Sequence, residues 1–212
     1  MKDKTQILYY IHDPMCSWCW GFRPVLEQLK QALPGSIEVR YVLGGLAPDT
    51  DLPMPQAMQN TIRETWERIQ HEIPGTEFNY DFWTKCSPRR STYPACRAII
   101  ACRMQQLETE QAMLLAIQRA YYLDARNPSE VEVLIQLAAE VGLDVEMFKH
   151  DLKSDACRDA LESEILLARS LDVHSFPSLV LLQGATESGI YIDYNSSDII
   201  IQQIVDKMTA FL

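Results

Sequence analysis

The stretch DPMCSWCWGF, residues 13–22, holds two cysteines, Cys16 and Cys19, with two residues between them. A short apolar run at residues 6–11 precedes it and predicts a buried strand. An apolar stripe from about residue 17 to 33 follows it and predicts a helix, which Pro34-Gly35 ends. The cysteine pair is therefore expected where a strand gives way to a helix.

A helix start favours ionised sulfur, because its first N–H groups lack partners and the helix dipole adds partial positive charge there. The thiolate is the species that attacks disulfides. Cys16, nearer the helix start, is the expected nucleophile. Cys19, one turn further on, can reach back and resolve a mixed disulfide. Pro24, inside the same helix, removes one backbone hydrogen bond and is expected to kink it.

Pro177 supplies a second candidate element, since it follows Phe176 and precedes an apolar strand at residues 178–182. Most X–Pro bonds in folded proteins are trans, and an ordinary proline at a strand start is one interpretation. A cis bond would instead turn the backbone of Phe176 toward the sulfur pair, where it could pair with an extended substrate peptide. Trp18, between the cysteines, is the tryptophan with the best case for exposure. The expected substrate-binding residues are Trp18, Phe176 and Pro177.

The rest of the chain predicts an α/β fold interrupted by a helical block. Alternating apolar residues at 37–43 predict a second strand, and residues 47–56 contain three prolines and resemble a linker. From there to about residue 154 we find only helical patterns. Ser129 and Glu132 form a capping box, and Asp144 is expected to cap the next helix. The predicted division is 1–46 and 155–212 for a thioredoxin-like domain in two parts, and 47–154 for a helical insertion domain.

The last segment returns to mixed α/β structure. A helix carries Cys157, Leu161 and Ile165, and two antiparallel strands follow at residues 178–182 and 189–194, with Gly184 and Gly189 bracketing the turn. Ser197 is expected to cap a final helix. Without the helical block, the predicted order is β-α-β-α-β-β-α.

DPMCSWCWGF, Pro24 and SFPSLVLL (residues 175–182) together resemble the DsbA family of the thioredoxin-like fold, and most closely its FrnE-like, predicted protein-disulfide-isomerase branch. The resemblance in element order covers essentially the whole chain. It implies a cis Pro177, a helical domain inserted after the second strand, and nucleophilic and resolving roles for Cys16 and Cys19. Ser17-Trp18 departs from the Pro-His dipeptide of the best-known periplasmic members, and no signal peptide is recognisable.

Composition excludes several classes of partner. The 212 residues carry a formal net charge of −10, with 47% hydrophobic and 23% charged residues, which is ordinary for a globular protein. An acidic surface repels phosphate backbones and anionic lipids, so neither nucleic acid nor membrane is expected as a partner. The apolar run near the N-terminus is too short for a secretory signal, so the expected location is cytoplasmic.

The remaining cysteines, histidines and aromatic residues have plainer interpretations. No second Cys-x-x-Cys occurs, so we expect no zinc site, and no cofactor is implied. Cys86, Cys96, Cys102 and Cys157 are expected in or near the core, with a Cys86–Cys96 disulfide as an alternative. His12 and His174 lie near the two motifs, where we favour structural or solvent-facing roles over a cation beside Cys16. Core positions are expected for Trp20, Phe22, Trp66 and Trp83, and a solvated loop for Arg89-Arg90.

The leading hypothesis is a thiol–disulfide oxidoreductase, similar to a protein-disulfide isomerase, that acts on thiols or disulfides of proteins or small molecules. An alternative is a glutathione-dependent enzyme, because kappa-class glutathione transferases and hydroxychromene-carboxylate isomerases resemble this layout. They use a single serine, however, and the intact cysteine pair argues against that role. A third hypothesis is a non-catalytic peptide-binding module with an apolar groove.

Overall fold

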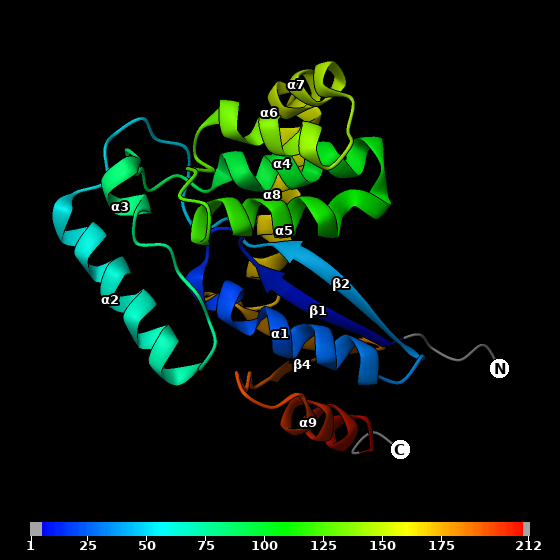
Figure 1. Ribbon diagram of the computed structural model, residues 1–212. Coiled ribbons are helices and arrows are strands. Elements are labelled where there is room, and N and C mark those ends of the chain that lie inside the picture. The colour runs from blue at the N-terminus through cyan, green and yellow to red at the C-terminus, as the bar shows by residue number, and fades with distance from the viewer. Residues whose placement is uncertain (1–5, 210–212) are drawn as a thin grey trace.

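Strand β1 (Gln6–His12) lies inside a four-stranded sheet, between β2 (Ile37–Leu43) and β3 (Ser178–Gln183), and β4 (Thr186–Ile190) pairs with the far side of β3. The structure is a computed structural model that describes residues 6–209 (Figure 1). β1 and β2 are parallel, whereas β3 is antiparallel to both β1 and β4. The predicted thioredoxin-like α/β fold is confirmed.

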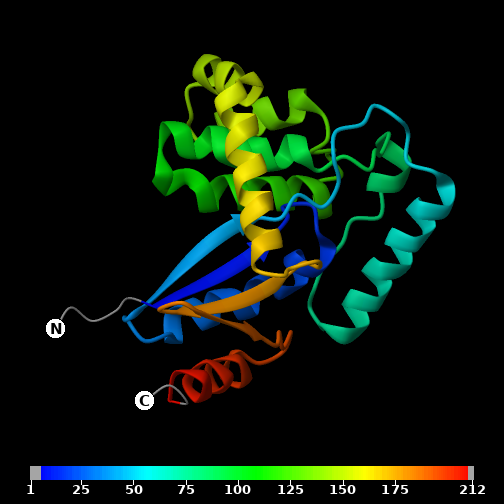
Figure 2. The ribbon, with the colours of Figure 1, turned by 180° about the vertical axis from the view of Figure 1, so that it is seen from behind.

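Helices cover both faces of this sheet (Figure 2). α1 (Ser17–Ala32) and α9 (Ser197–Thr209) pack on one face, and α8 (Asp155–Ser170) crosses the other. Alternation along the strands explains both contacts, because successive side chains point to opposite faces. The first face buries Leu8, Tyr10, Phe22, Leu29, Leu179, Leu181, Ile200 and Ile204, and the second buries Ile11, Val42, Ala168 and Val180.

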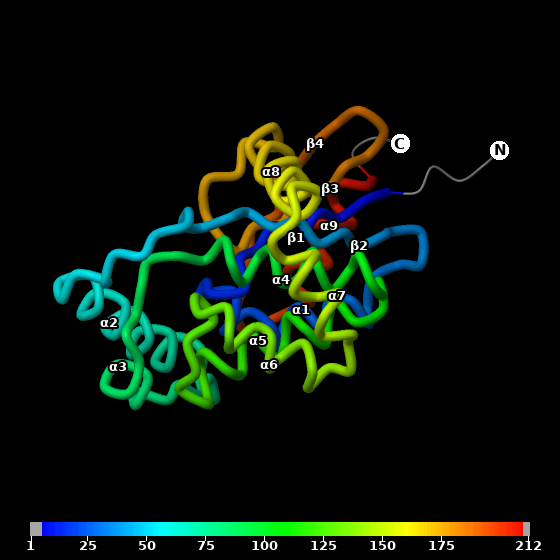
Figure 3. The backbone as a smooth tube through the Cα atoms, turned by 90° about the horizontal axis from the view of Figure 1, so that it is seen from above, coloured from blue at the N-terminus to red at the C-terminus, as the bar shows by residue number. Residues whose placement is uncertain are grey.

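The helical block lies beyond one end of the sheet and beside the start of α1 (Figures 1 and 3). Residues 47–153 contain an isolated bridge between Pro53 and Arg89 and otherwise helices, turns and loops. These helices are α2 (Gln56–Glu72), α3 (Phe82–Lys85), α4 (Tyr93–Gln105), the 3₁₀ turn Leu107–Thr109, α5 (Glu110–Tyr122), α6 (Val131–Glu140) and α7 (Val145–Lys153).

α8 connects the helical block to the sheet. Its residues Cys157, Leu161 and Ile165 pack into the apolar cluster of the block, and Ala168 packs against the sheet. The expected boundary between residues 154 and 155 therefore falls inside one continuous cluster. The division into domains remains a prediction.

The hairpin of β3 and β4 corrects the prediction of a strand at residues 189–194. Gly184, with a φ of 63°, lies in the turn, and Gln183 pairs with Thr186 across it. That short turn sets the register, so β4 begins at Thr186 and Gly189 lies inside it, opposite Val180. Residues 191–194 have already left the sheet.

The predicted caps had mixed outcomes. The Asp144 carboxylate accepts a hydrogen bond from the Met147 amide at 2.8 Å, which confirms its cap. The predicted capping box is wrong, because Glu130 occupies the N-cap position of α6 and the Ser129 hydroxyl donates to the Ser91 carbonyl oxygen at 2.7 Å. That tertiary contact takes the hydroxyl away from the helix start. Ser197 is the first residue of α9 rather than a residue before it.

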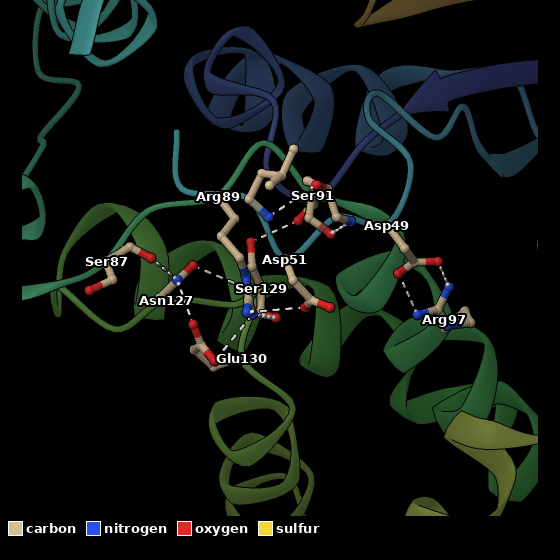
Figure 4. Close-up of polar contacts among 11 residues, drawn as sticks. Asp49, Asp51, Ser87, Arg89, Ser91, Arg97, Asn127, Ser129 and Glu130 are labelled. Carbon is tan, nitrogen blue, oxygen red and sulfur yellow. Dashed lines mark hydrogen bonds and ion pairs between the residues drawn. The ribbon is translucent and has the colours of Figure 1, made fainter. Parts of the chain in front are cut away.

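A polar cluster within the helical block joins residues 49–51 to Arg89 and Arg97 (Figure 4). Arg97 binds Asp49 through two hydrogen bonds of 2.7 Å, and the Arg89 guanidinium donates to the Ser129 carbonyl oxygen at 2.6 Å. Arg89 also lies 3.1 Å from the Glu130 carboxylate, and its side chain is 21% exposed. The prediction of a solvated loop is therefore wrong for Arg89, because the surrounding carboxylates and carbonyl hold its charged end.

Candidate active site

The cysteine motif lies at the carboxyl end of β1, where α1 begins. After His12 the chain turns, and the Cys16 amide donates to the Asp13 carbonyl oxygen at 3.1 Å. Cys16 is the N-cap residue of α1, with an extended backbone. Both Cys16 and Cys19 are free thiols, with exposures of 6% and 0%. Cys16 therefore lies at the start of α1, and Cys19 is fully buried in its first turn.

Asp13 holds the loop of the motif in place, a role that the sequence analysis missed. Its buried carboxylate accepts hydrogen bonds from the Met15 amide at 2.8 Å, the Leu46 amide at 2.7 Å and the Thr92 hydroxyl at 2.6 Å. These donors come from the motif, from the segment after β2 and from the start of α4. The sequence signal for this role was the Asp13-Pro14 pair directly before the cysteines, because aspartate side chains commonly bond to the backbone of a turn.

The Phe176–Pro177 loop, directly before β3, lies next to the cysteine motif. Their peptide bond is cis, and the Cys16 thiol donates to the Phe176 carbonyl oxygen at 3.3 Å. The sheet explains this meeting, because β3 runs antiparallel to β1 and pairs Ser178 with Ile11. The structure thus brings Cys16, Phe176 and Pro177 together from positions 160 residues apart.

Gly44, directly after β2, makes room for the Phe176 ring. A Cβ atom built on Gly44 would lie 2.0 Å from Cε1 of that ring. This is far inside contact distance, so the ring occupies space that only a residue without a side chain leaves free. Phe176 is half-buried, and its place depends on this glycine.

Trp18 is half-buried rather than free. Its ring centroid lies 5.0 Å from that of Tyr194, and the Arg68 guanidinium carbon lies 4.8 Å from the centroid of the Trp18 ring. The positive charge over an aromatic face is favourable, so Arg68 and Tyr194 fix the side chain of Trp18 on the surface beside the cysteines.

Ser17 contacts the helical block. The indole N–H of Trp66, on α2, donates to the Ser17 hydroxyl at 2.9 Å. Trp66 is fully buried and stacks on Phe78, with ring centroids 4.8 Å apart. Trp20, Phe22, Trp66 and Trp83 are all buried, as the sequence predicts, but the sequence does not show that Trp66 reaches the motif.

The electrostatics distinguish the two sulfurs. Burial raises the pKa of the Cys19 thiol well above its usual value, and a hydrogen bond to the Cys16 sulfur raises it further. Burial, followed by charge repulsion from Cys19, likewise raises the pKa of the neighbouring Tyr10 hydroxyl. The raised pKa favours the protonated form of Cys19. Cys16 differs in position, because it lies at the start of α1.

The two histidines have different surroundings. His12 is 1% exposed, stacks on Tyr10 at 5.0 Å and meets Tyr41 edge-on at 5.5 Å. Burial, and then the charge of Arg103, lower the pKa of His12 to about 3. His174 is exposed and lies 3.0 Å from Asp172.

The other four cysteines have partners outside the motif. Cys96 lies 3.5 Å from the Asp13 carboxylate, and the Cys86 thiol donates to the Ala125 carbonyl oxygen at 3.0 Å. The alternative of a Cys86–Cys96 disulfide is therefore wrong, because both are free thiols. Between residues 6 and 209, no group of three metal-ligating side chains is arranged to hold an ion. Over the same residues, no helix combines the length and apolarity needed to cross a membrane.

Comparison with known proteins places this geometry in a family. The family model described as Thioredoxin matches residues 9–203. A curated relative, the ClpXP adapter protein SpxH of Halalkalibacterium halodurans, is 27% identical over 215 residues, which cover 99% of this chain and 70% of the relative. SpxH of Bacillus subtilis is 25% identical over 95% of this chain and 67% of its own.

Solved structures agree with this placement. A crystal structure from Nitrosomonas europaea, described provisionally as a protein disulfide isomerase, has a TM-score of 0.83 and 26% identity, covering 98% of both chains. The cytosolic disulfide reductase DsbM from Pseudomonas aeruginosa has a TM-score of 0.74 at 24% identity, covering 97% of this chain and all of its own, and supports the fold. The chain therefore belongs to the thioredoxin family, as a DsbA-like member of the thioredoxin-like fold.

Proposed function

We propose that the protein is a thiol–disulfide oxidoreductase, similar to a protein-disulfide isomerase, in which Cys16 attacks and Cys19 resolves. The observation that carries the proposal is the position of the Cys16 sulfur, at the start of α1 and 3.3 Å from the Phe176 carbonyl oxygen. This position supports the proposal, because the Cys16 sulfur lies beside backbone that could align an extended substrate. Trp18, Phe176 and Pro177 are the proposed substrate contacts.

The reaction takes two exchanges. The Cys16 thiolate attacks a substrate disulfide, forms a mixed disulfide and releases one substrate thiolate. Cys19 then loses its proton, attacks the Cys16 sulfur and releases the second substrate thiolate, which leaves a Cys16–Cys19 disulfide. Reversal of these steps oxidises a substrate. Isomerisation results when Cys16 attacks a substrate disulfide and another substrate thiolate, rather than Cys19, then displaces Cys16.

Reduction of insulin by dithiothreitol, followed by turbidity, tests this proposal. We expect Cys16→Ser to abolish acceleration and Cys19→Ser to accumulate a mixed disulfide with insulin, detectable by mass spectrometry. Cys86→Ser is the matched control, because Cys86 contacts Ala125 away from the motif, and it should retain activity. Full acceleration by Cys16→Ser would contradict the proposal.

A second candidate function is that of a protein adapter, favoured by the name of the curated relatives, ClpXP adapter protein SpxH. An adapter would bind its partner through a surface and would not need the sulfurs. Affinity capture with the Cys16→Ser/Cys19→Ser protein separates the two, since an adapter partner stays bound and a covalently captured substrate does not. The cytoplasmic location remains a prediction, which fractionation of cells would check.

A further inference from the structure

A cavity of about 490 Å³ is bounded by α1, α5 and residues 73–77, the segment that follows α2. In Figure 1, α5 runs above α1, and this segment passes between α2 and the start of α1. Trp20 and Tyr194 also line the cavity, and Tyr194 contacts the ring of Trp18. The cavity therefore adjoins the motif, but neither of the motif's sulfurs belongs to its lining.

Two arginines line this cavity from different helices, Arg23 from α1 and Arg119 from α5. In the part of the chain that the structure describes, neither forms an ion pair with a carboxylate. Arg97 and Arg103, by contrast, are each paired with carboxylates. The lining thus holds two positive charges that the protein leaves without a counter-charge, although its formal net charge is −10. Such a concentration of positive charge attracts an anion.

An aromatic ring, rather than a carboxylate, holds Arg23 in place. The guanidinium carbon lies 5.0 Å from the centroid of the Trp20 ring, which is a favourable position for a positive charge. Trp20 is itself buried, and its indole N–H donates to the Glu77 carbonyl oxygen at 3.1 Å. Nε of Arg23 has no hydrogen-bond partner in the protein. The charge is therefore fixed at the wall of the cavity, and no group of the chain neutralises it.

The chemistry of the lining selects the kind of anion. A guanidinium binds a planar carboxylate through two parallel hydrogen bonds, so two guanidiniums on different helices suit a molecule with two carboxylates. The volume of about 490 Å³ is within the range of small-molecule sites. Glu77, the acidic residue of the lining, is exposed, and its carboxylate disfavours a ligand with more negative charge than the two arginines balance.

We propose that this cavity binds a small dicarboxylate, with one carboxylate on the Arg23 guanidinium and the other on that of Arg119. Binding is non-covalent and uses neither sulfur of the motif, so the inference goes beyond the proposed function and does not depend on it. The bound molecule would connect α1 to α5. It should therefore stabilise the folded protein and raise its midpoint of thermal unfolding.

Titration calorimetry with glutarate, at pH 7 and constant ionic strength, tests this proposal. We expect glutarate to bind the wild type at one site and to raise the thermal midpoint. Butyrate, which has a single carboxylate, should bind at least about 10-fold more weakly, because one guanidinium then lacks its partner. Arg119→Met and Arg23→Met should each weaken glutarate binding by about 10- to 100-fold. Arg23→Lys keeps the charge but not the paired hydrogen bonds, so its effect should be smaller than that of Arg23→Met.

Arg40→Gln is the matched control, since it removes one positive charge from β2, outside this lining, and should leave glutarate binding unchanged. The Cys16→Ser/Cys19→Ser protein should also bind glutarate as the wild type does, which separates this site from thiol exchange. Arg119 is exposed, so Arg119→Met keeps the test valid even if the Arg23 variants fail to fold.

Three results would each overturn the inference. The first is an absence of glutarate binding to the wild type, and the second is equal affinity for glutarate and butyrate. The third is a loss of affinity in Arg40→Gln as large as that in Arg119→Met, because general charge attraction would then explain the binding. Loss of disulfide exchange with intact glutarate binding would bear on the proposed function alone.

Discussion

At the scale of single residues, Gly44 carries no side chain, and the ring of Phe176 fills the space where one would begin. Gly44→Ala should expel this ring from the site, with a loss of about 1–3 kcal/mol in the free energy of unfolding and a larger proportional loss of disulfide exchange. Denaturant midpoints and the insulin assay measure these. Gly35→Ala is the control, since a Cβ there meets nothing within 4 Å. Equal activity in the two variants would show that the position of Phe176 does not matter.

His12 makes the stability depend on pH. Its pKa falls from 6.5 to about 3 in the folded protein, mainly through burial. Between these values the unfolded chain binds more protons, so stability is fully present above pH 6.5 and is lost as pH falls toward 3. The loss is roughly 1 kcal/mol for each pH unit.

His12→Phe should remove this dependence. Neither ring nitrogen of His12 has a partner, and Tyr10 and Tyr41 surround an aromatic ring, so phenylalanine fits the same space. The urea midpoint should fall less between pH 7 and pH 4.5 in the variant than in the wild type. The titration of carboxylates is common to both proteins and cancels in this comparison. Equal falls of the urea midpoint in the two proteins would contradict a neutral His12 in the folded protein.

At the scale of elements, the contact between α2 and the start of α1 includes a hydrogen bond from the Trp66 indole to the Ser17 hydroxyl. Ser17→Ala and Trp66→Phe each remove it, and a double-mutant cycle should give a coupling free energy of about 1 kcal/mol. Guanidinium denaturation of the four proteins measures it. Both single variants should also shift the reduction potential of the Cys16–Cys19 pair, because Ser17 lies between the sulfurs. Additive free energies would show that the bond contributes nothing.

The sequence was sufficient for elements whose signals are local. The alternation at residues 37–43 and the stripe of α8 reproduce the observed strand and helix. Prediction from the sequence failed where contacts with residues far along the chain determine the local structure. Ser129 has the pattern of a cap but bonds to Ser91, and Gly189 looks like a turn residue but pairs inside β4. A lone sequence does not show which partner such a residue meets.

The same distinction applies to the site. Cys16, Cys19 and Pro177 belong to short motifs, so the sequence alone could propose them as site residues. Asp13 and Gly44 contact the site through segments that only the folded chain brings together, so their residue types alone did not identify them.

At the scale of the whole molecule, Glu164 on α8 joins the helical block to the sheet. Its carboxylate accepts from the Leu43 amide at 2.6 Å and pairs with Arg103 of α4. Glu164→Ala leaves the buried Leu43 amide without this acceptor and leaves Arg103 with Glu110 alone, at 3.4 Å, which should cost about 2 kcal/mol. Glu146→Ala, which breaks an exposed pair with Lys149, should cost less than about 1 kcal/mol. Thermal unfolding by calorimetry compares them, and equal costs would contradict the role of Glu164.

We also expect unfolding in one transition, because α8 contributes residues both to the apolar cluster of the helical block and to the cluster against the sheet. Calorimetric and van't Hoff enthalpies should agree for the wild type. Two separate transitions, or a protease-resistant fragment of residues 47–154, would show instead that the helical block folds independently.

The hydrogen bond between Cys16 and Phe176 spans 160 residues, and this separation matters while the protein is being made. At a ribosomal rate of roughly 5–20 residues per second, Phe176 follows Cys16 after about 8–32 s. During that interval the nascent chain exposes two thiols before the loop proposed to align a substrate has been synthesised. A newborn chain is therefore itself a candidate for oxidation by older copies, and pulse-labelled ribosome complexes would reveal how long Cys16 stays reduced.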